Sequence, residues 1–217
     1  MATEVDICNL ALAHLGDTAT VASIDPPEGS AQAEHCSRFY PMARDTLLEM
    51  YAWGFATKRV QLAMLGESWS EWTYAYAVPN DAVNVIAIIT LDATDDYSEA
   101  ILTNPNIPAG GAYVPQPFSC EIQDDGTQVI LTDQENAVLR YTALVSDTGT
   151  FSPLFVYALS WHLASMLAGP ILKGETGAAE VKRCIAMMNV YLSQAMESDA
   201  SQRRINPNQR VAWISGR

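Results

Sequence analysis

An uncharged, largely apolar run from 151 to 172 is the feature that most limits what this chain can fold into. Ser152 and Pro153 at its start are typical of a helix N-terminus, with the serine as the cap and the proline in the first turn. A helix of this length is long enough to cross a membrane. His162 and two serines near its centre, Pro170 near its end and several alanines instead favour a helix buried at the centre of a folded protein.

Two helices are predicted before that run, each from a cap and the apolar spacing that follows it. Thr3 is placed to cap a first helix, with Asp6 three residues later, and Gly16 is placed to end it. Ser30 begins a second helix after a turn rich in proline and glycine. Pro41 lies inside this second helix and should kink or divide it.

A last helix is predicted after Gly174, because apolar residues recur there at i, i+3 and i+4. It should pack on the run 151–172 as an antiparallel hairpin. The side chains expected to face the core are Cys8, Ala11, Leu12 and Leu15 on the first helix; Cys36, Phe39, Tyr40, Ala43, Leu47, Met50 and Tyr51 on the second; and Val181, Cys184, Ile185, Met188, Tyr191, Leu192 and Ala195 on the last.

Between the second helix and the apolar run, the pattern changes to that of strands. Trp72, Tyr74 and Tyr76 alternate with smaller or polar residues, and β-branched residues fill much of 83–91. The sequence Asp124-Asp125-Gly126 is typical of a hairpin turn. The other expected strands are 118–122 and 128–132, which this turn joins, and 137–145.

These patterns together predict an α+β fold: an α-helical bundle with a β-rich inserted subdomain and an extended C-terminal arm. The expected bounds are 1–68 for the first part of the helical body, 69–150 for the β-rich insertion, 151–200 for the helical hairpin that completes the body, and 201–217 for the arm.

Charge is unevenly distributed along the chain. Residues 201–217 contain four arginines and no acid, whereas the other 200 residues contain 8 basic and 25 acidic side chains, a net charge of −17. Such an acidic body should repel nucleic acid rather than bind it. No basic region precedes an apolar run near the first residues, so we expect no secretory signal and synthesis in the cytoplasm.

No pattern typical of a catalytic, cofactor or metal site stands out. The four cysteines lack any CxxC spacing and are expected to be buried, reduced thiols. Each of the three widely separated histidines is expected to be hydrogen-bonded or exposed, although folding could gather them. The acidic stretch from Asp92 to Glu99 lacks the order of a calcium-binding loop and is expected to be a solvated loop. We therefore predict no enzyme activity, although acid pairs that folding could assemble for glycoside hydrolysis stay open.

The arm is the strongest candidate for binding a partner, and a disordered end without a partner is the alternative. A tail that only meets solvent needs no large apolar groups, yet this one mixes them with arginines, a composition common in interfaces. The candidate contacts with a partner or neighbouring subunits are Arg203, Arg204, Ile205, Arg210, Val211, Trp213 and Ile214.

Several segments, in order along most of the chain, resemble a known family of proteins. They are ICNLALAHLGD, AEHCSRFYPMARDTLLEMYAWGFATKRVQLA, YAYAVPND, VLRYTALVSD and FSPLFVYALSWHLASMLAGPI. The sequence is similar in these stretches to the head-to-tail adaptor family of short-tailed bacteriophages, the tail tubular protein A-like proteins.

This resemblance implies a structural virion protein without a cofactor. Twelve copies would form a ring in the neck, between the portal protein and the tail nozzle or tail tube protein, with the arm reaching the portal subunits. DNA would pass through the ring's channel without specific binding, and no membrane would be involved. The protein would be found in the virion, and in the host cytoplasm during assembly.

Two other classes of function stay open from the sequence. A soluble protein-binding module outside any virion would have the same composition, but it would bind a defined partner and form no ring. A hydrolase would need acids or histidines gathered in a pocket, and related phage proteins have sometimes been credited with cell-wall hydrolysis.

Overall fold

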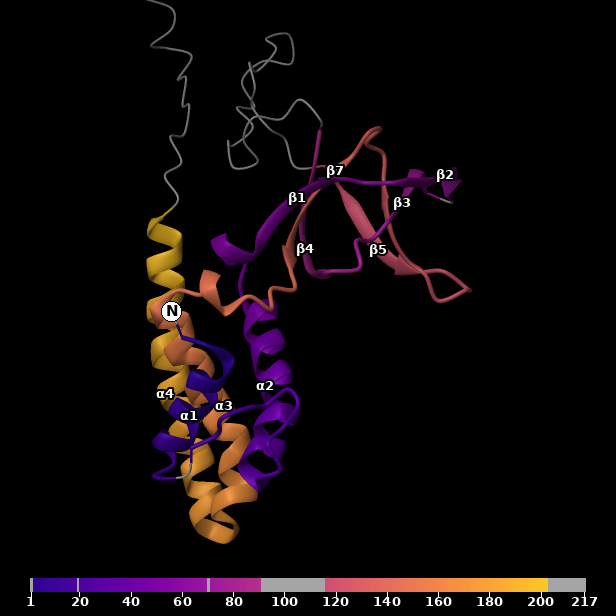
Figure 1. Ribbon diagram of the computed structural model, residues 1–217. Helices are drawn as coiled ribbons and strands as arrows, with labels where there is room; N and C mark the ends of the chain where they lie inside the picture. The colour runs from indigo at the N-terminus through magenta and orange to yellow at the C-terminus, as the bar shows by residue number, and fades with distance from the viewer. Residues whose placement is uncertain (1, 19, 70, 91–115, 203–217) are drawn as a thin grey trace, which may run out of the picture. The chain divides into compact units, whose positions relative to one another are not determined.

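The computed structural model describes residues 2–18, 20–69, 71–90 and 116–202 (Figure 1). Its four helices and two antiparallel sheets form a mixed α+β fold, as predicted. The chain divides into two compact units. The helical unit comprises Met1–Ala56 and Leu144–Gln202, and the β unit is the intervening segment Thr57–Ala143.

The first helix, α1, spans Glu4–His14 and begins with the cap that the sequence predicts. The N–H of Asp6 donates to the Thr3 hydroxyl at 3.1 Å, and the N–H of Thr3 donates to the Asp6 carboxylate at 2.9 Å. This reciprocal pair satisfies backbone groups that the first turn leaves unpaired. Gly16, with φ of +76°, follows the helix end in the left-handed conformation that glycine adopts readily.

The second helix, α2, spans Ala31–Met50 and is capped by Ser30, as expected. Pro41 does not divide it. The ring removes the hydrogen bond to the carbonyl of Ser37, but Pro41 is exposed, so water can reach this side of the helix. Met50 was expected in the core and is 49% exposed, because it lies at the last turn of α2.

The apolar run forms α3, Pro153–Leu172, and a single residue, Lys173, separates it from α4, Gly174–Ser201. The two helices pack along their length as the expected hairpin. A Cβ atom on Gly177 would lie 3.0 Å from the carbonyl oxygen of Ala168. Glycine at this position therefore lets α4 approach α3 closely.

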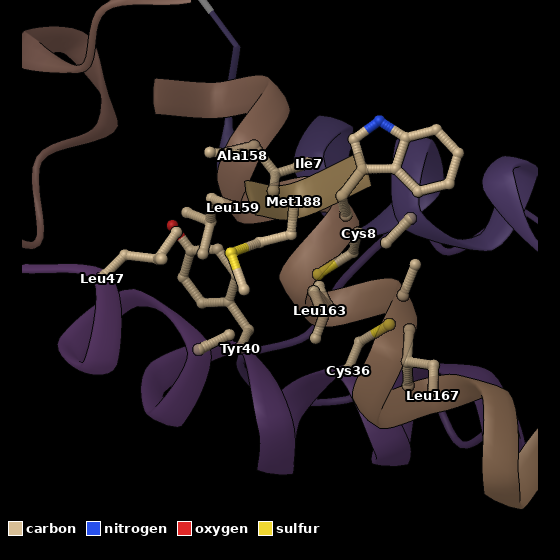
Figure 2. Close-up of a cluster of buried hydrophobic side chains, with 14 of the residues drawn as sticks. Ile7, Cys8, Cys36, Tyr40, Leu47, Ala158, Leu159, Leu163, Leu167 and Met188 are labelled. Atoms are coloured by element: carbon tan, nitrogen blue, oxygen red, sulfur yellow. The ribbon is translucent and has the colours of Figure 1, made fainter. Parts of the chain in front are cut away.

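Helix α3 lies at the centre of the helical unit, in contact with α1, α2 and α4 (Figure 1). Its Ser152 cap accepts from the N–H of Phe155 at 3.3 Å. Among the described helices it is the one whose length and hydropathy would suit a membrane span, and more than half of its most apolar stretch is buried. Figure 2 shows Leu159 and Leu163 of α3 in the core with Tyr40 of α2.

The segment after α2 joins the core through aromatic side chains. Trp53 is fully buried and donates its indole N–H to the carbonyl of Leu47 at 2.7 Å. Its ring lies 5.8 Å from that of Phe55 and 5.0 Å from that of Phe155, and Phe151 contacts both phenylalanines. These contacts tie the two sequence-distant halves of the helical unit together.

Within its described residues, the β unit contains two antiparallel sheets. One has the order β1–β7–β4 and the other the order β2–β3–β6–β5. The first strand, β1, pairs with the last, β7, with Thr57 opposite Thr142. The strands are β1 Thr57–Gln61, β2 Met64–Trp69, β3 Trp72–Ala77, β4 Ala82–Ile89, β5 Phe118–Ile122, β6 Gln128–Thr132 and β7 Val138–Ala143.

The strands begin earlier than the sequence indicated. They were expected from residue 69 but start at Thr57. The sequence pattern did not reveal β1 and β2, because β1 is mostly polar and exposed and β2 contains a glycine and a register shift. Neither strand therefore shows a clean apolar alternation. At the other end the last strand stops at Ala143, and 148–150 form a short 3-10 helix in the helical unit. A second short 3-10 helix, Gly54–Ala56, precedes β1. The predicted hairpin is confirmed, with β5 and β6 joined by a turn in which Gly126 has φ of +85°.

The aromatic contacts of Trp53 yield a stability prediction. Replacing Trp53 with alanine should lower the free energy of unfolding by about 3–5 kcal/mol, because it removes a fully buried ring and leaves a cavity. Met50→Ala, at an exposed position of the same unit, should change it by less than about 0.5 kcal/mol. Urea unfolding of both variants checks this, and equal effects would contradict the assigned core.

Candidate functional site

The arm residues predicted to contact partners lie outside the described residues. This applies to Arg203, Arg204, Ile205, Arg210, Val211, Trp213 and Ile214, and also to the acidic stretch 92–99. Helix α4 runs to Ser201, so the chain leaves the helical unit at the end of its longest helix.

The outer face of α4 is weakly charged. No charged residue occurs from 184 to 196, and the side chains at the centre of this face are small or apolar, with the exposed Asn189 and Gln194 at its borders. Val190, 49% exposed, lies near the middle of this face, with Ala186 one turn before it and Ser193 after it. Lys182 provides a positive charge toward the start of α4. Small side chains of this kind allow another helix to approach closely.

The outer face of α2 also exposes a large apolar side chain. Met42 is 57% exposed and lies on the side of α2 opposite its buried residues. Arg38 lies one turn before it, and Asp45 and Glu49 follow it toward the end of the helix. An apolar centre with a charged rim is the composition of many protein interfaces.

These two faces lie on opposite flanks of the helical unit. Helices α2 and α4 both pack on α3, and they make at most marginal contact with each other (Figure 1). The outer face of α2 and the outer face of α4 therefore point away from each other. Two different surfaces on opposite flanks can form head-to-tail contacts, which build rings when the rotation closes.

A polar and aromatic cluster joins α1, α3 and α4. The His14 ring stacks on Trp161, with 3.6 Å between centroids, and its Nε2 lies 3.0 Å from the Ser160 hydroxyl oxygen. Arg183 donates to the carbonyl of His14 at 2.7 Å, and its guanidinium carbon lies 5.2 Å from the centre of the Trp161 ring. Glu180 accepts from Arg183 at 2.6 Å. The cluster fixes the end of α1 against the α3–α4 hairpin.

The contact between His14 and Ser160 is that of a packed side chain rather than of an activated nucleophile. Ser160 is fully buried and donates its one hydroxyl proton to the carbonyl of Tyr157 at 2.9 Å. Its oxygen is then the acceptor for Nε2–H of His14. Burial, and secondly the positive charge of Arg183, lower the pKa of His14 from 6.5 to about 4.

The expectation of hydrogen-bonded or exposed histidines is wrong for His162. Both of its ring nitrogens are buried without a hydrogen-bond partner among the described residues. Burial lowers the pKa of His162, so the ring is neutral at pH 7. His35 departs from the expectation at one ring nitrogen: its Nδ1 is buried without a hydrogen-bond partner among the described residues. Helical spacing alone did not reveal how deep these rings lie.

Three of the four cysteines are buried, as expected, and the fourth is not. Figure 2 shows Cys8 and Cys36 in the core of the helical unit, and the hydrogen bond between them, together with burial, raises the pKa of the Cys8 thiol. Cys184 is also buried. Cys120 is exposed, because it lies on β5, an edge strand.

No group of metal-binding side chains gathers in the described ranges.

Acidic side chains exceed basic ones in both units. Within the described residues the ratio is more than two to one in the helical unit and in the β unit alike. Of the few basic groups, Arg44 is buried beside Asp45, with 2.8 Å between Nε and Oδ1, and Lys58 pairs with Asp81 at 2.8 Å. The field around each unit is therefore negative.

Sequence reasoning did not identify the two outer faces. Ile185 was expected in the core and is 41% exposed at the border of the α4 face. The sequence feature that could have indicated the α4 face is the uncharged stretch 184–196, because a helix face that meets only solvent usually carries charged side chains.

Comparison of the sequence with known protein families and with curated proteins finds no match.

The lowered pKa of His14 predicts how stability depends on pH. The unfolded chain binds a proton at His14 below about pH 6.5, whereas the folded protein does so only near pH 4. The free energy of unfolding should therefore fall as the pH falls from 6.5 toward 4. His14→Gln keeps a hydrogen-bond donor but does not titrate, so its stability should fall less over this range. Urea unfolding at several pH values measures the difference, and parallel curves would contradict it.

Proposed function

We propose that this chain is a structural virion protein, the ring subunit that connects the capsid portal to the tail of a short-tailed bacteriophage. The resemblance of five segments to the head-to-tail adaptor family supports this proposal. A helical unit that carries a β insertion is also the organisation that this resemblance implies. In this role the protein contacts the portal protein, the tail nozzle or tail tube protein, and further copies of itself.

The observation that carries the proposal is the pair of outer faces on α2 and α4. Each is a face whose exposed centre is apolar, at Met42 and Val190, and the two point to opposite flanks. In a ring, the α4 face of one subunit meets the α2 face of the next. Lys182 on one face and Glu34 on the other give opposite charges near the beginnings of the two helices.

The charge of both units suits a channel for DNA. A channel wall that bound phosphates would slow the passage of the genome, whereas an excess of carboxylates repels them. Acids exceed basic groups in each unit by more than two to one. The proposed ring therefore passes DNA without holding it.

The arm provides the contact with the portal in this proposal. Trp213 acts as the apolar anchor, and Arg203, Arg204 and Arg210 pair with carboxylate or carbonyl groups. Because the arm contacts the portal only where a portal is present, the free protein stays monomeric until then.

The first test is the mass of the assemblies. Light scattering should show a monomer for the purified protein and a large increase in the mass of portal rings when the protein is added. A chain that ends at Ser201 should fold normally but add no mass, because it lacks the arm. If the full-length protein leaves the portal's mass unchanged, the adaptor proposal fails and a binding module with another partner takes its place.

A matched pair of variants tests the two faces. Ala186→Glu places a charge on the α4 face, and Ala13→Glu places the same charge at an exposed position of α1, outside both faces. With the portal, Ala13→Glu should form rings like the wild type, whereas Ala186→Glu should bind without completing a ring. Negative-stain images and mass measurements distinguish these products. Complete rings from Ala186→Glu would show that the faces are not the ring contacts.

The opposite flank supplies a second test of the same contact. Met42→Glu should also prevent complete rings, because it charges the α2 face. In an equal mixture of the two variants, the intact α4 face of Met42→Glu can bind the intact α2 face of Ala186→Glu. The other two faces of such a pair are both altered, so paired subunits should form on the portal but no rings. Restored rings in the mixture would contradict a head-to-tail contact.

A further inference from the structure

The β unit contains a groove between two strands that face each other without pairing along their length. Strands β4 and β5 are each the last strand of their sheet (Figure 1). Among the described residues they are bridged at Ile88 and Gln116, where the N–H of Gln116 donates to the carbonyl of Ile88 at 3.2 Å. Away from this bridge the strands separate around a groove of about 480 Å³.

The groove is apolar along its walls and acidic at one end. Val83 and Val85 of β4 lie on one side, and Phe118 and Ile122 of β5 lie on the other. Ile122 is 69% exposed, the largest exposed fraction among the large apolar side chains described. Apolar surface left open in this way is typical of a binding groove.

The acidic end extends along the β5–β6 turn. A second hollow of about 460 Å³ shares Glu121 and Ile122 with the first and is also lined by Asp124 and Asp125. Among the described residues, no lysine or arginine lines either hollow. The groove therefore suits an extended segment that combines apolar side chains with positive charge.

The backbone of the two edge strands also favours an extended segment as the occupant. Edge strands present unpaired N–H and C=O groups, and proteins commonly cover such edges or pair them with an added strand. A segment bound there would gain main-chain hydrogen bonds from β4 or β5 and would place alternate side chains between the walls.

The residues after Gln202 have this composition. Residues 201–217 contain four arginines and no acid, and Val211 and Trp213 are spaced to lie on one side of an extended chain. We propose that, in the free protein, residues 203–217 dock in the groove between β4 and β5 of the same chain. The arginines then lie near the acidic end, and Val211 and Trp213 lie between the apolar walls.

The tether favours the chain's own tail over other occupants. Extended, the residues after Gln202 reach about 50 Å, and a segment tethered by so short a length of chain has an effective concentration on the order of 1 mM. A second copy reaches such a concentration only in very concentrated solution. This docking does not depend on the proposed ring, and the portal takes no part in its test.

Cys120 provides a natural probe of the groove. It lines the groove and is exposed, whereas Cys8, Cys36 and Cys184 are buried, so a thiol reagent reacts first at Cys120. The rate of alkylation of Cys120 in the full chain should be about tenfold lower than in a chain that ends at Gln202, for a tail that binds with a Kd of about 0.1 mM. Circular dichroism and thermal unfolding confirm that the shortened chain is folded.

Added peptide and charge variants test the chemistry. A peptide of residues 203–217 should slow alkylation of the shortened chain, and the same peptide with Trp213→Ala should not. In the full chain, Asp124→Lys should raise the alkylation rate several-fold, because it repels the arginines. Glu135→Lys, at an exposed acid of the same unit that does not line the groove, should leave the rate unchanged.

The protection of Cys120 from alkylation distinguishes the chain's own tail from the tail of a second copy. Protection that is independent of protein concentration, lost on truncation and restored by the peptide supports the proposal. Protection that increases with protein concentration assigns the groove to the tail of a second copy and overturns docking within one chain. Equal alkylation rates in the full and shortened chains, with no effect of the peptide, overturn the proposal altogether.

Discussion

The burial of one uncharged helix governs the rest of this structure. Helix α3 has no formal charge from end to end, so most of its surface needs apolar partners, and α1, α2 and α4 supply them. Two of these partners precede the β unit in the chain and one follows it. The core of the helical unit therefore forms only when both ends of the chain come together, and the β unit is held as an insertion between them.

Much of this arrangement follows from local chemistry that the sequence displays. The Thr3 and Ser152 caps, the turn at Gly126 and the apolar spacing of α4 all depend on neighbours a few residues away, and each was predicted. Strand β1 was missed because its pairing with β7 depends on residues far along the chain, and a polar edge strand has no signature of its own. The depth of His162 and the exposure of Val190 likewise depend on which helix lies next to which.

The candidate surfaces share one physical logic. The α2 and α4 faces and the β4–β5 groove are places where apolar groups or backbone edges are left open on units that are otherwise acidic. The excess of acidic side chains on both units limits unspecific association, so contacts form where charge is absent or opposite in sign. A basic, apolar tail on an acidic protein can therefore have more than one binding place, and competition between them would set when each is used.

The pairing of β1 with β7 has a consequence for how such a protein can change over time. The strand that enters the β unit and the strand that leaves it are hydrogen-bonded neighbours, with Thr57 opposite Thr142. A genetic exchange with both breakpoints beside this pair would remove or replace the whole unit while rejoining the chain at two adjacent points. The helical unit and its buried α3 would keep their sequence, so variation in whatever the β unit contacts could be inherited separately from the scaffold that carries it.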